Sequence, residues 1–323
     1  MEKPTDNLVS IVIPLYNATD ILFDCLESVS KQTYQSIEVI CVDDGSQNCL
    51  GEIICKEFQK KDPRFFYYRK KNGGPGSARN YGIRYCKGNY ILFIDSDDTI
   101  EQNMVNIMVE KITDDNSDIV ICGYFLYQNK KYSCQQIGRS YSGTREDFIC
   151  NEFERLYRDF LINAPWNKMI RSSFLHKYQL KFYEEFSFLE DLIFSLNLIE
   201  KSSIISVVNQ PLYNYHYFRP GALTTLYHAK TDQAILLVGE ILERGFLDYL
   251  ENKAYFYGDL IHKSLIFFYS VRVNQNLSWK DKYDKIKNLL LNPQYQSYLY
   301  QAKSDRLKMK IKILGLKLVT KII

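Results

Sequence analysis

The sequence predicts an α/β fold built on a central sheet that is mostly parallel. Two observations lead to this prediction: short β-branched runs alternate with segments whose apolar residues recur at helical spacing, and polar clusters follow the runs. Strands that alternate with helices need crossover connections, and such connections favour parallel pairing. A chain of 323 residues is long enough for one large α/β unit with an appendage, or for two domains.

The alternation runs through the first hundred residues. Strands are expected at 9–13, 37–42, 65–68 and 90–94, and helices at 21–29, 50–58 and 77–86. Beyond His228 the pattern changes, because 231–244, 253–273 and 280–291 all have helical spacing and no comparable strand signal lies between them. We therefore expect an α/β domain over 1–228 and a small helical domain over 229–323.

Composition narrows the function classes. A net charge of +3 is too small for a protein whose main partner is a nucleic acid. The eight cysteines contain no C-x-x-C pair, which favours reduced thiols over a disulfide scaffold. The polar residues 1–7 do not resemble a signal peptide, and no stretch approaches the ~18 apolar residues of a spanning helix. We expect a cytoplasmic protein.

Three polar clusters follow the expected strands. They are Tyr16 with Asn17, the segment 43–45, and the segment 95–98. Ligands gather outside the carboxyl ends of parallel strands, and carboxylates packed together repel one another unless a positive species offsets them. Asp95 and Asp97 lie two residues apart in extended chain, so both carboxylates can face one Mg²⁺ or Mn²⁺ ion. The alternative is that residues 96–98 cap a following helix.

Other residues near these clusters suit a nucleotide. Asp43 could accept a hydrogen bond from a ring N–H of a base, and Tyr16 could stack on that base. The guanidinium of Arg79 could bind phosphate or a base carbonyl. Each has a simpler alternative: Asp43 as a turn residue, and Arg79 as a solvated surface charge.

The four segments 9–17 (VSIVIPLYN), 42–46 (VDDGS), 72–80 (NGGPGSARN) and 93–98 (FIDSDD) resemble, in order and spacing, the family 2 glycosyltransferases with the GT-A fold, whose Rossmann-like sheet is mostly parallel. The resemblance covers about 9–224 and is densest before Thr99. It implies a nucleotide-binding half over 1–99 and an acceptor half over 100–228. It also implies the donor contacts, which are Pro14, Tyr16, Asn17, Asp43, Gly74, Arg79, Asp95 and Ser96. Asp95 and Asp97 would hold Mn²⁺ or Mg²⁺.

The downstream segments resemble the acceptor half of the same family. Segment 165–168 (PWNK) resembles a motif near the sugars, which places Trp166 and Lys168 at the acceptor or phosphate. Asp191 matches the general base of inverting members, which must take the proton of the attacking hydroxyl, and Glu190 would orient the acceptor or the base. The alternatives are a core tryptophan at 166 and helix N-terminal carboxylates at 190 and 191.

The segment 213–221 resembles the family's closing segment. His216 is expected as a third metal ligand or a phosphate donor, although a lone histidine can equally be structural. Arg219 is expected at the phosphate or the acceptor. Ala222 departs from the family's usual small hydroxyl residue, so no donor contact is expected there.

The last 21 residues, 303–323, contain seven basic residues and one acid. Apolar residues at 307, 311, 314 and 318 lie on one face of a helix, and lysines at 303, 310, 317 and 321 lie on another. This pattern is typical of peripheral contact with the inner face of the cell membrane, but it also fits packing on the chain's own domain or on a partner.

The resemblance implies a metal-dependent inverting glycosyltransferase. The donor would be a UDP-sugar such as UDP-galactose or UDP-glucose, giving a hexose or N-acetylhexosamine. The acceptor would be a glycan in bacterial surface polysaccharide or glycoprotein assembly. A second copy or another glycosyltransferase could be a partner. The alternatives are a nucleotidyltransferase, a sugar-nucleotide hydrolase, and a non-catalytic partner of another transferase. The turn after the first strand has no G-x-G-x-x-G, which disfavours a dinucleotide-dependent oxidoreductase.

Overall fold

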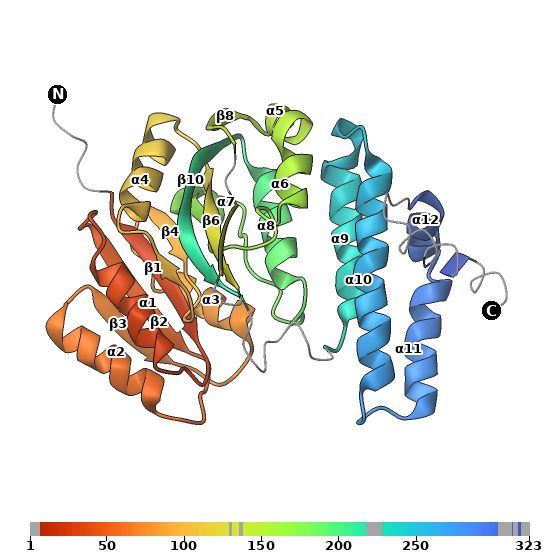
Figure 1. Ribbon diagram of the computed structural model, residues 1–323, viewed down its shortest axis with the longest axis horizontal. Coiled ribbons are helices and arrows are strands. Elements are labelled where there is room, and N and C mark those ends of the chain that lie inside the picture. Colours follow the sequence, from red (N-terminus) through yellow and green to blue (C-terminus); the bar gives the residue numbers. More distant parts are fainter. Residues whose placement is uncertain are drawn as a thin grey trace. The chain divides into compact units, whose positions relative to one another are not determined.

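The computed structural model describes residues 7–128, 131–135, 138–217, 228–302, 312 and 316–317 (Figure 1). The chain divides into two compact units, Met1–Glu184 with Phe194–Arg219, and Glu185–Ile193 with Pro220–Ile323. The first unit is α/β, and the second consists mainly of helices. The expected boundary after residue 228 lies near the break between Arg219 and Pro220, whereas the segment Glu185–Ile193 was not expected to belong to the second unit.

The first part of the α/β unit follows the predicted alternation. Strands β1 (Val9–Leu15), β2 (Ile37–Asp43), β3 (Phe65–Arg69) and β4 (Tyr90–Phe93) pair in parallel in the order β3-β2-β1-β4. Helices α1 (Ile21–Ser30), α2 (Leu50–Lys61) and α3 (Pro75–Ile83) connect them. All seven residues of β2 are buried, as expected for a strand covered on both faces.

Close packing holds α3 against the parallel strands. A Cβ atom at Gly82 would lie 2.4 Å from a methyl group of Val12, so only glycine permits this approach. Leu15 pairs with Asp43 across β1 and β2, so the two strands end at the same level. The polar residues that follow them therefore share one edge of the sheet.

The rest of the sheet is mixed. Its order continues from β4 through β9 (Lys168–Arg171), β6 (Ile119–Gln128) and β10 (Ile204–His216) to β5 (Thr99–Ile100). Strand β9 runs antiparallel to both β4 and β6, while β6 and β10 are parallel. Strands β7 (Lys131–Gln135) and β8 (Tyr141–Thr144) add antiparallel pairs to β6 and β10. The predicted α/β class is confirmed, and the parallel pairing is continuous from β3 to β4.

The remaining helices of this part of the chain lie between the later strands. They are α4 (Met104–Asp114), α5 (Arg145–Phe148), a π-helical turn (Ile149–Phe153), α6 (Glu154–Arg158), α7 (Ser172–Lys177) and α8 (Glu190–Lys201). Helix α4 buries Met104, Val105, Met108, Val109 and Ile112, which recur at helical spacing.

The second unit contains α9 (Thr231–Gly245), a short 3-10 helix (Leu247–Tyr249), α10 (Lys253–Val273), α11 (Trp279–Leu291) and α12 (Pro293–Gln301). Two tyrosines of α12 pack it against the other helices. The Tyr295 hydroxyl forms a hydrogen bond of 2.6 Å with Ser264 of α10, and the Tyr298 ring covers Gly239 of α9. Helix α12 was not predicted. Asn292 caps it by accepting hydrogen bonds from two backbone N–H groups.

Within the described residues no helix is long and apolar enough to cross a bilayer. Most of the predicted amphipathic helix over 303–323 lies outside the described residues, which include only Lys312, Leu316 and Lys317 there.

Candidate nucleotide and metal site

The acidic segment 95–98 connects two distant strands. The chain leaves β4 at Phe93 and enters β5 at Thr99, and β5 pairs with β10 on the far side of β9 and β6 in the sheet order. The segment therefore brings three carboxylates to the end of β10. One oxygen each of Asp95, Asp97 and Asp98 lie within 4.8 Å of one another.

Asp98 is the buried member of this cluster. Burial raises the pKa of Asp98 to about 6, and the negative charge of Asp95 also raises it, whereas hydrogen bonds from the His216 backbone N–H and the Tyr213 hydroxyl lower it. Because burial and a neighbouring carboxylate both disfavour the charged form of Asp98, a positive charge placed nearby would stabilise the cluster.

Strand β10 holds Asp98 in place through two of its residues. The Tyr213 hydroxyl donates to Asp98 Oδ2 at 2.8 Å, and the His216 backbone N–H donates to Oδ1 at 2.8 Å. The Asp95 backbone N–H donates to the same Tyr213 oxygen at 3.1 Å. One phenol thus fixes both ends of the acidic segment.

The His216 imidazole also faces the cluster. Its Nδ1 lies 3.6 Å from Asp98 Oδ1, and this buried nitrogen has no hydrogen-bond partner within the part of the chain that the structure describes. Carboxylate oxygens with an imidazole nitrogen form a donor set that Mn²⁺ accepts, and Mg²⁺ accepts the oxygens. The three carboxylates therefore fit a divalent cation, and the imidazole nitrogen of His216 lies beside one of them, Asp98.

Arg79 reaches the same cluster from α3. Its guanidinium donates to Asp95 Oδ1 at 2.8 Å and lies 5.2 Å from the centroid of the Phe182 ring. The side chain is almost fully buried. Arg79 is thus not a solvated surface charge but balances one carboxylate of the acidic segment.

Asp43 is oriented by two hydrogen bonds at the end of β2. Its Oδ1 accepts from the Ser46 backbone N–H at 2.7 Å, and its Oδ2 accepts from the Tyr67 hydroxyl at 2.8 Å. Each carboxylate oxygen has a second lone pair, so the fixed side chain can still accept from a ligand. Tyr67 was not expected at the site, because its position beside Asp43 depends on the pairing of β2 with β3.

The neighbouring Asp44 has a structural role in the loop before α3. It accepts from Lys70 Nζ at 2.6 Å and from the backbone N–H groups of Gly73 and Gly74. Gly74 has φ of 89°, a conformation that favours glycine, and a Cβ there would meet nothing within 4 Å. Asp44 thus fixes the glycine turn that opens α3, with open space beside Gly74.

The loop after β1 is tied to the loop after β2. The Asn17 backbone N–H donates to Ser46 Oγ at 2.8 Å, and Asn17 Oδ1 accepts from the Gln47 N–H at 2.8 Å. The backbone N–H and the side-chain oxygen of Asn17 thus stabilise the loop, and the donor contact expected of this residue stays a prediction. Tyr16 is 51% exposed, so its ring is open for stacking, and Pro14 lies within β1, opposite Val42.

Comparison with known proteins identifies the family. The model of "Glycosyl transferase family 2" matches residues 10–179. The chain belongs to this family. It is 32% identical to glycosyltransferase GlyA of Streptococcus pneumoniae over 72% of this chain and 33% of that protein. It is 35% identical to the putative glycosyltransferase EpsH of Bacillus subtilis over 67% of this chain and 61% of that protein. The chain thus spans between one third and about three fifths of the length of these two relatives.

Solved structures confirm the GT-A fold. A structure of Staphylococcus aureus TarS 1-349 in complex with UDP-GlcNAc matches 97% of this chain and 89% of that chain, with a TM-score of 0.70 and 18% identity. A mannosyltransferase from Pyrobaculum calidifontis in complex with GDP-Man and Mn²⁺ matches 98% of this chain and 88% of that chain, with a TM-score of 0.53 and 11% identity.

Trp166, which was expected near the acceptor of this family 2 member, lies in its aromatic core. Trp166 is buried and stacks on Tyr213 at 4.2 Å and on Tyr215 at 5.3 Å between ring centroids. It therefore supports the phenol that holds Asp98.

Lys168 is buried, and its ammonium group does not lie at an acceptor or phosphate surface as expected. It donates to the carbonyls of Leu161 and Ile162 at 3.0 Å, to the Ala164 carbonyl, and to Asn167 Oδ1 at 2.9 Å. An ammonium group has three protons, and these acceptors use them. The side chain fastens the loop that precedes β9.

Four further site residues were expected, namely Ser96, Glu190, Asp191 and Arg219. Glu190 and Asp191 open α8 and belong to the second unit, where Glu190 is buried and Asp191 is half-buried. Leu189, just before them, has φ of 67°. Ser96 is half-buried within the acidic segment. Arg219 lies outside the described residues.

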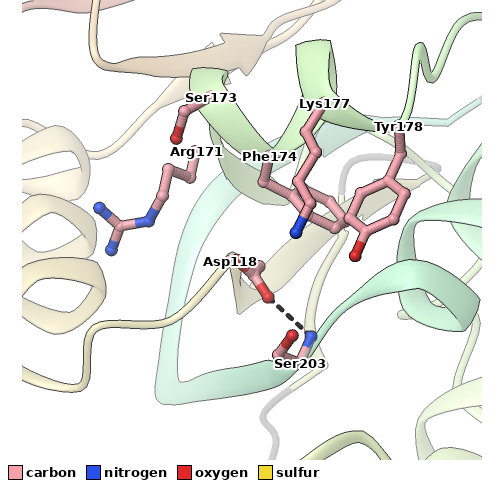
Figure 2. Close-up of a pocket in the computed structure, with 7 residues that line it drawn as sticks. All are labelled: Asp118, Arg171, Ser173, Phe174, Lys177, Tyr178 and Ser203. Carbon is pink, nitrogen blue, oxygen red and sulfur yellow. Dashed lines mark hydrogen bonds between the residues drawn. The ribbon is translucent and has the colours of Figure 1, made fainter.

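A cavity of about 240 Å³ lies at the opposite edge of the sheet (Figure 2). Asp118 precedes β6, Ser203 precedes β10, and Arg171 pairs with Tyr90 at the start of β4. The Ser203 backbone N–H donates a hydrogen bond to Asp118 Oδ2 at 2.7 Å, and Figure 2 draws this bond as a dashed line. The cavity therefore lies at the amino ends of the parallel strands and is separate from the acidic segment.

Proposed function

We propose that this protein is a metal-dependent inverting glycosyltransferase that uses a UDP-sugar. The convergence of Asp95, Asp97 and Asp98 with His216, at the sheet edge where Asp43 and Tyr16 also lie, carries the proposal. Oxygen-rich sites at the carboxyl ends of strands suit a nucleotide diphosphate. The UDP-GlcNAc complex of TarS 1-349 supports the choice of donor class.

The donor base would lie against the loops that follow β1 and β2. Asp43 would accept the ring N–H of uracil, because its carboxylate is already oriented by Ser46 and Tyr67. The exposed Tyr16 ring would stack on the base. Asp95 and Ser96 would lie near the ribose. The open space beside Gly74 would leave room for the donor.

Asp95, Asp97 and His216 would hold Mn²⁺ or Mg²⁺. Such a cation supplies positive charge that offsets the charge developing on the departing diphosphate. The Tyr213 hydroxyl holds the Asp98 carboxylate and the Asp95 backbone through two hydrogen bonds, so the site would be preorganised before a cation binds.

Asp191 would act as the general base and Glu190 would orient the acceptor or the base. The acceptor oxygen forms a bond to the anomeric carbon, while the bond from that carbon to the diphosphate oxygen breaks and the diphosphate takes the electron pair. The hydroxyl proton passes to the Asp191 carboxylate. The acceptor would be a hydroxyl of a glycan in bacterial surface polysaccharide or glycoprotein assembly, and the protein would work in the cytoplasm.

The test is a panel of UDP- and GDP-sugars with Mn²⁺, in which transfer and hydrolysis are measured separately. Asp97→Ala should abolish metal-supported donor binding, and Asp191→Asn should bind donor without transferring. Asp24→Ala, an exposed carboxylate on α1, is the matched control and should behave as wild type. Full transfer by Asp191→Asn would exclude Asp191 as the base, and release of free sugar regardless of acceptor would favour a hydrolase.

A further inference from the structure

We propose that one face of the helical unit docks on an anionic lipid bilayer. This face, here called the aromatic face, lies at the end of α10 and the start of α11 and consists of Ile266, Tyr269, Val273, Trp279 and Tyr283. All five side chains are exposed. The proposal does not depend on the glycosyltransferase activity.

Helix α10 carries apolar residues on two opposite sides. Leu260, Phe267 and Val271 are buried on the inner side. Ile266, Tyr269 and Val273 follow one another at spacings of three and four residues, so they form a single stripe. This stripe is solvent-exposed, and Tyr269 is 68% exposed. Exposed apolar stripes of this kind indicate an interaction site.

Helix α11 extends the stripe. Trp279 and Tyr283 lie four residues apart on the side of α11 that buries Leu290 further along. Trp279 is 85% exposed. Lys282 Nζ donates to the Arg272 carbonyl at 3.0 Å, so the start of α11 is tied to the end of α10. The exposed apolar residues thus lie on the parts of α10 and α11 next to the turn that joins these helices.

Helix α11 carries an excess of positive charge beside its exposed aromatic rings. Helix α11 carries four lysines (Lys280, Lys282, Lys285 and Lys287) and two aspartates, and Asp281 is held in a capping box by Ser278. Lys282 Nζ lies 5.5 Å from the Trp279 ring centroid, and Lys287 Nζ lies 5.4 Å from that of Tyr283. The ammonium groups therefore lie beside the aromatic rings.

This composition favours a lipid surface over a second copy of the chain. Tryptophan and tyrosine are enriched where one end of the ring is apolar and the other is wet, and lysine is attracted to anionic headgroups. A symmetric dimer through this face would bring two identical sets of lysines together, and like charges oppose such contact. The aromatic rings would enter the headgroup region while the lysines contact phosphate.

Tryptophan fluorescence tests the proposal, because the chain has two tryptophans and Trp166 is buried. The full chain is mixed with vesicles of phosphatidylcholine containing 30% phosphatidylglycerol, and with pure phosphatidylcholine. We expect co-sedimentation and a blue shift with the anionic vesicles alone, both weaker at 300 mM than at 50 mM NaCl. Trp279→Phe should remove the blue shift.

Variants separate this face from the basic tail. Trp279→Ala with Tyr283→Ala should weaken vesicle binding at least tenfold, and Lys280→Gln or Lys285→Gln about fivefold each. Phe160→Ala, an exposed aromatic of the α/β unit, is the control and should bind as wild type. If Trp279→Ala with Tyr283→Ala binds as wild type and only Lys308→Gln with Lys310→Gln reduces binding, the proposal is wrong. A blue shift that depends on protein concentration without vesicles would assign the face to self-association and overturn it.

Discussion

The Tyr213 hydroxyl donates a hydrogen bond of 2.8 Å to Asp98, although 115 residues separate them in the chain. Tyr213 lies on β10, and Asp98 ends the acidic segment that follows β4. The same phenol oxygen accepts from the Asp95 backbone, so β10 holds both ends of the acidic segment. A buried tyrosine on β10 thus orients the Asp98 carboxylate and holds the Asp95 backbone.

Tyr213→Phe removes this hydroxyl without changing the ring stack on Trp166. We expect the free energy of unfolding to fall by about 1–3 kcal/mol, because a buried carboxylate loses a donor. Mn²⁺ affinity should fall as well. Denaturant unfolding and Mn²⁺ titration measure the two effects. Tyr215→Phe, on the same strand, is the control, and an equal loss in both variants would contradict the special role of Tyr213.

Asp43 and Asp44 are adjacent and both buried, but their substitution should affect different properties of the protein. Asp43→Asn should weaken UDP binding about tenfold or more with little change in Tm, because the base would lose a charged acceptor. Asp44→Asn should lower Tm, because Lys70 and the glycine turn lose their anchor. Calorimetry with UDP and thermal unfolding distinguish them. The reverse pattern would exclude Asp43 from base recognition.

Lys168→Met tests whether the buried lysine stabilises the loop that precedes β9. Three backbone carbonyls lose their donor, so we expect a loss of about 2–4 kcal/mol in the free energy of unfolding. The transfer rate per folded molecule should change little. A variant of normal stability that has lost activity would instead restore Lys168 to the acceptor or phosphate site.

Gly239→Ala tests the packing of the helical unit. A Cβ atom at this position would lie 2.3 Å from the Tyr298 ring, so we expect a destabilisation of about 1–3 kcal/mol from overpacking. Adding Tyr298→Ala should relieve the clash, so Gly239→Ala should cost little in that background. Denaturant unfolding of the four proteins measures the coupling, and additive effects would argue against the contact.

The sequence predicted those parts of the fold that depend on residues close together in the chain. The alternation of strands and helices before Thr99 and the polar residues at the strand ends are confirmed, because spacing and strand-ending residues act over a few neighbours. The antiparallel insertion of β9 and the hydrogen bond of Tyr213 depend on pairing between distant segments. Helix α12 is short and rich in polar and aromatic residues, so only Asn292 and Pro293 marked its start.

Site residues divide in the same way. The cluster of Asp95, Asp97 and Asp98 could be predicted, because it lies in one short segment. The engagement of Lys168 with carbonyls and of Asn17 with Ser46 could not, because sequence spacing does not say whether a polar group faces a ligand or the backbone. The salt bridge between Arg79 and Asp95 likewise depends on how α3 packs on the sheet.

The most direct test of the central claim is calorimetric titration of UDP into the protein with and without MnCl₂. Wild type should bind UDP at least tenfold more tightly with Mn²⁺, and Asp97→Ala should show the weaker affinity under both conditions. UDP affinity that is unchanged by Mn²⁺ in wild type, or a metal effect that survives in Asp97→Ala, would contradict a cation held by the acidic segment.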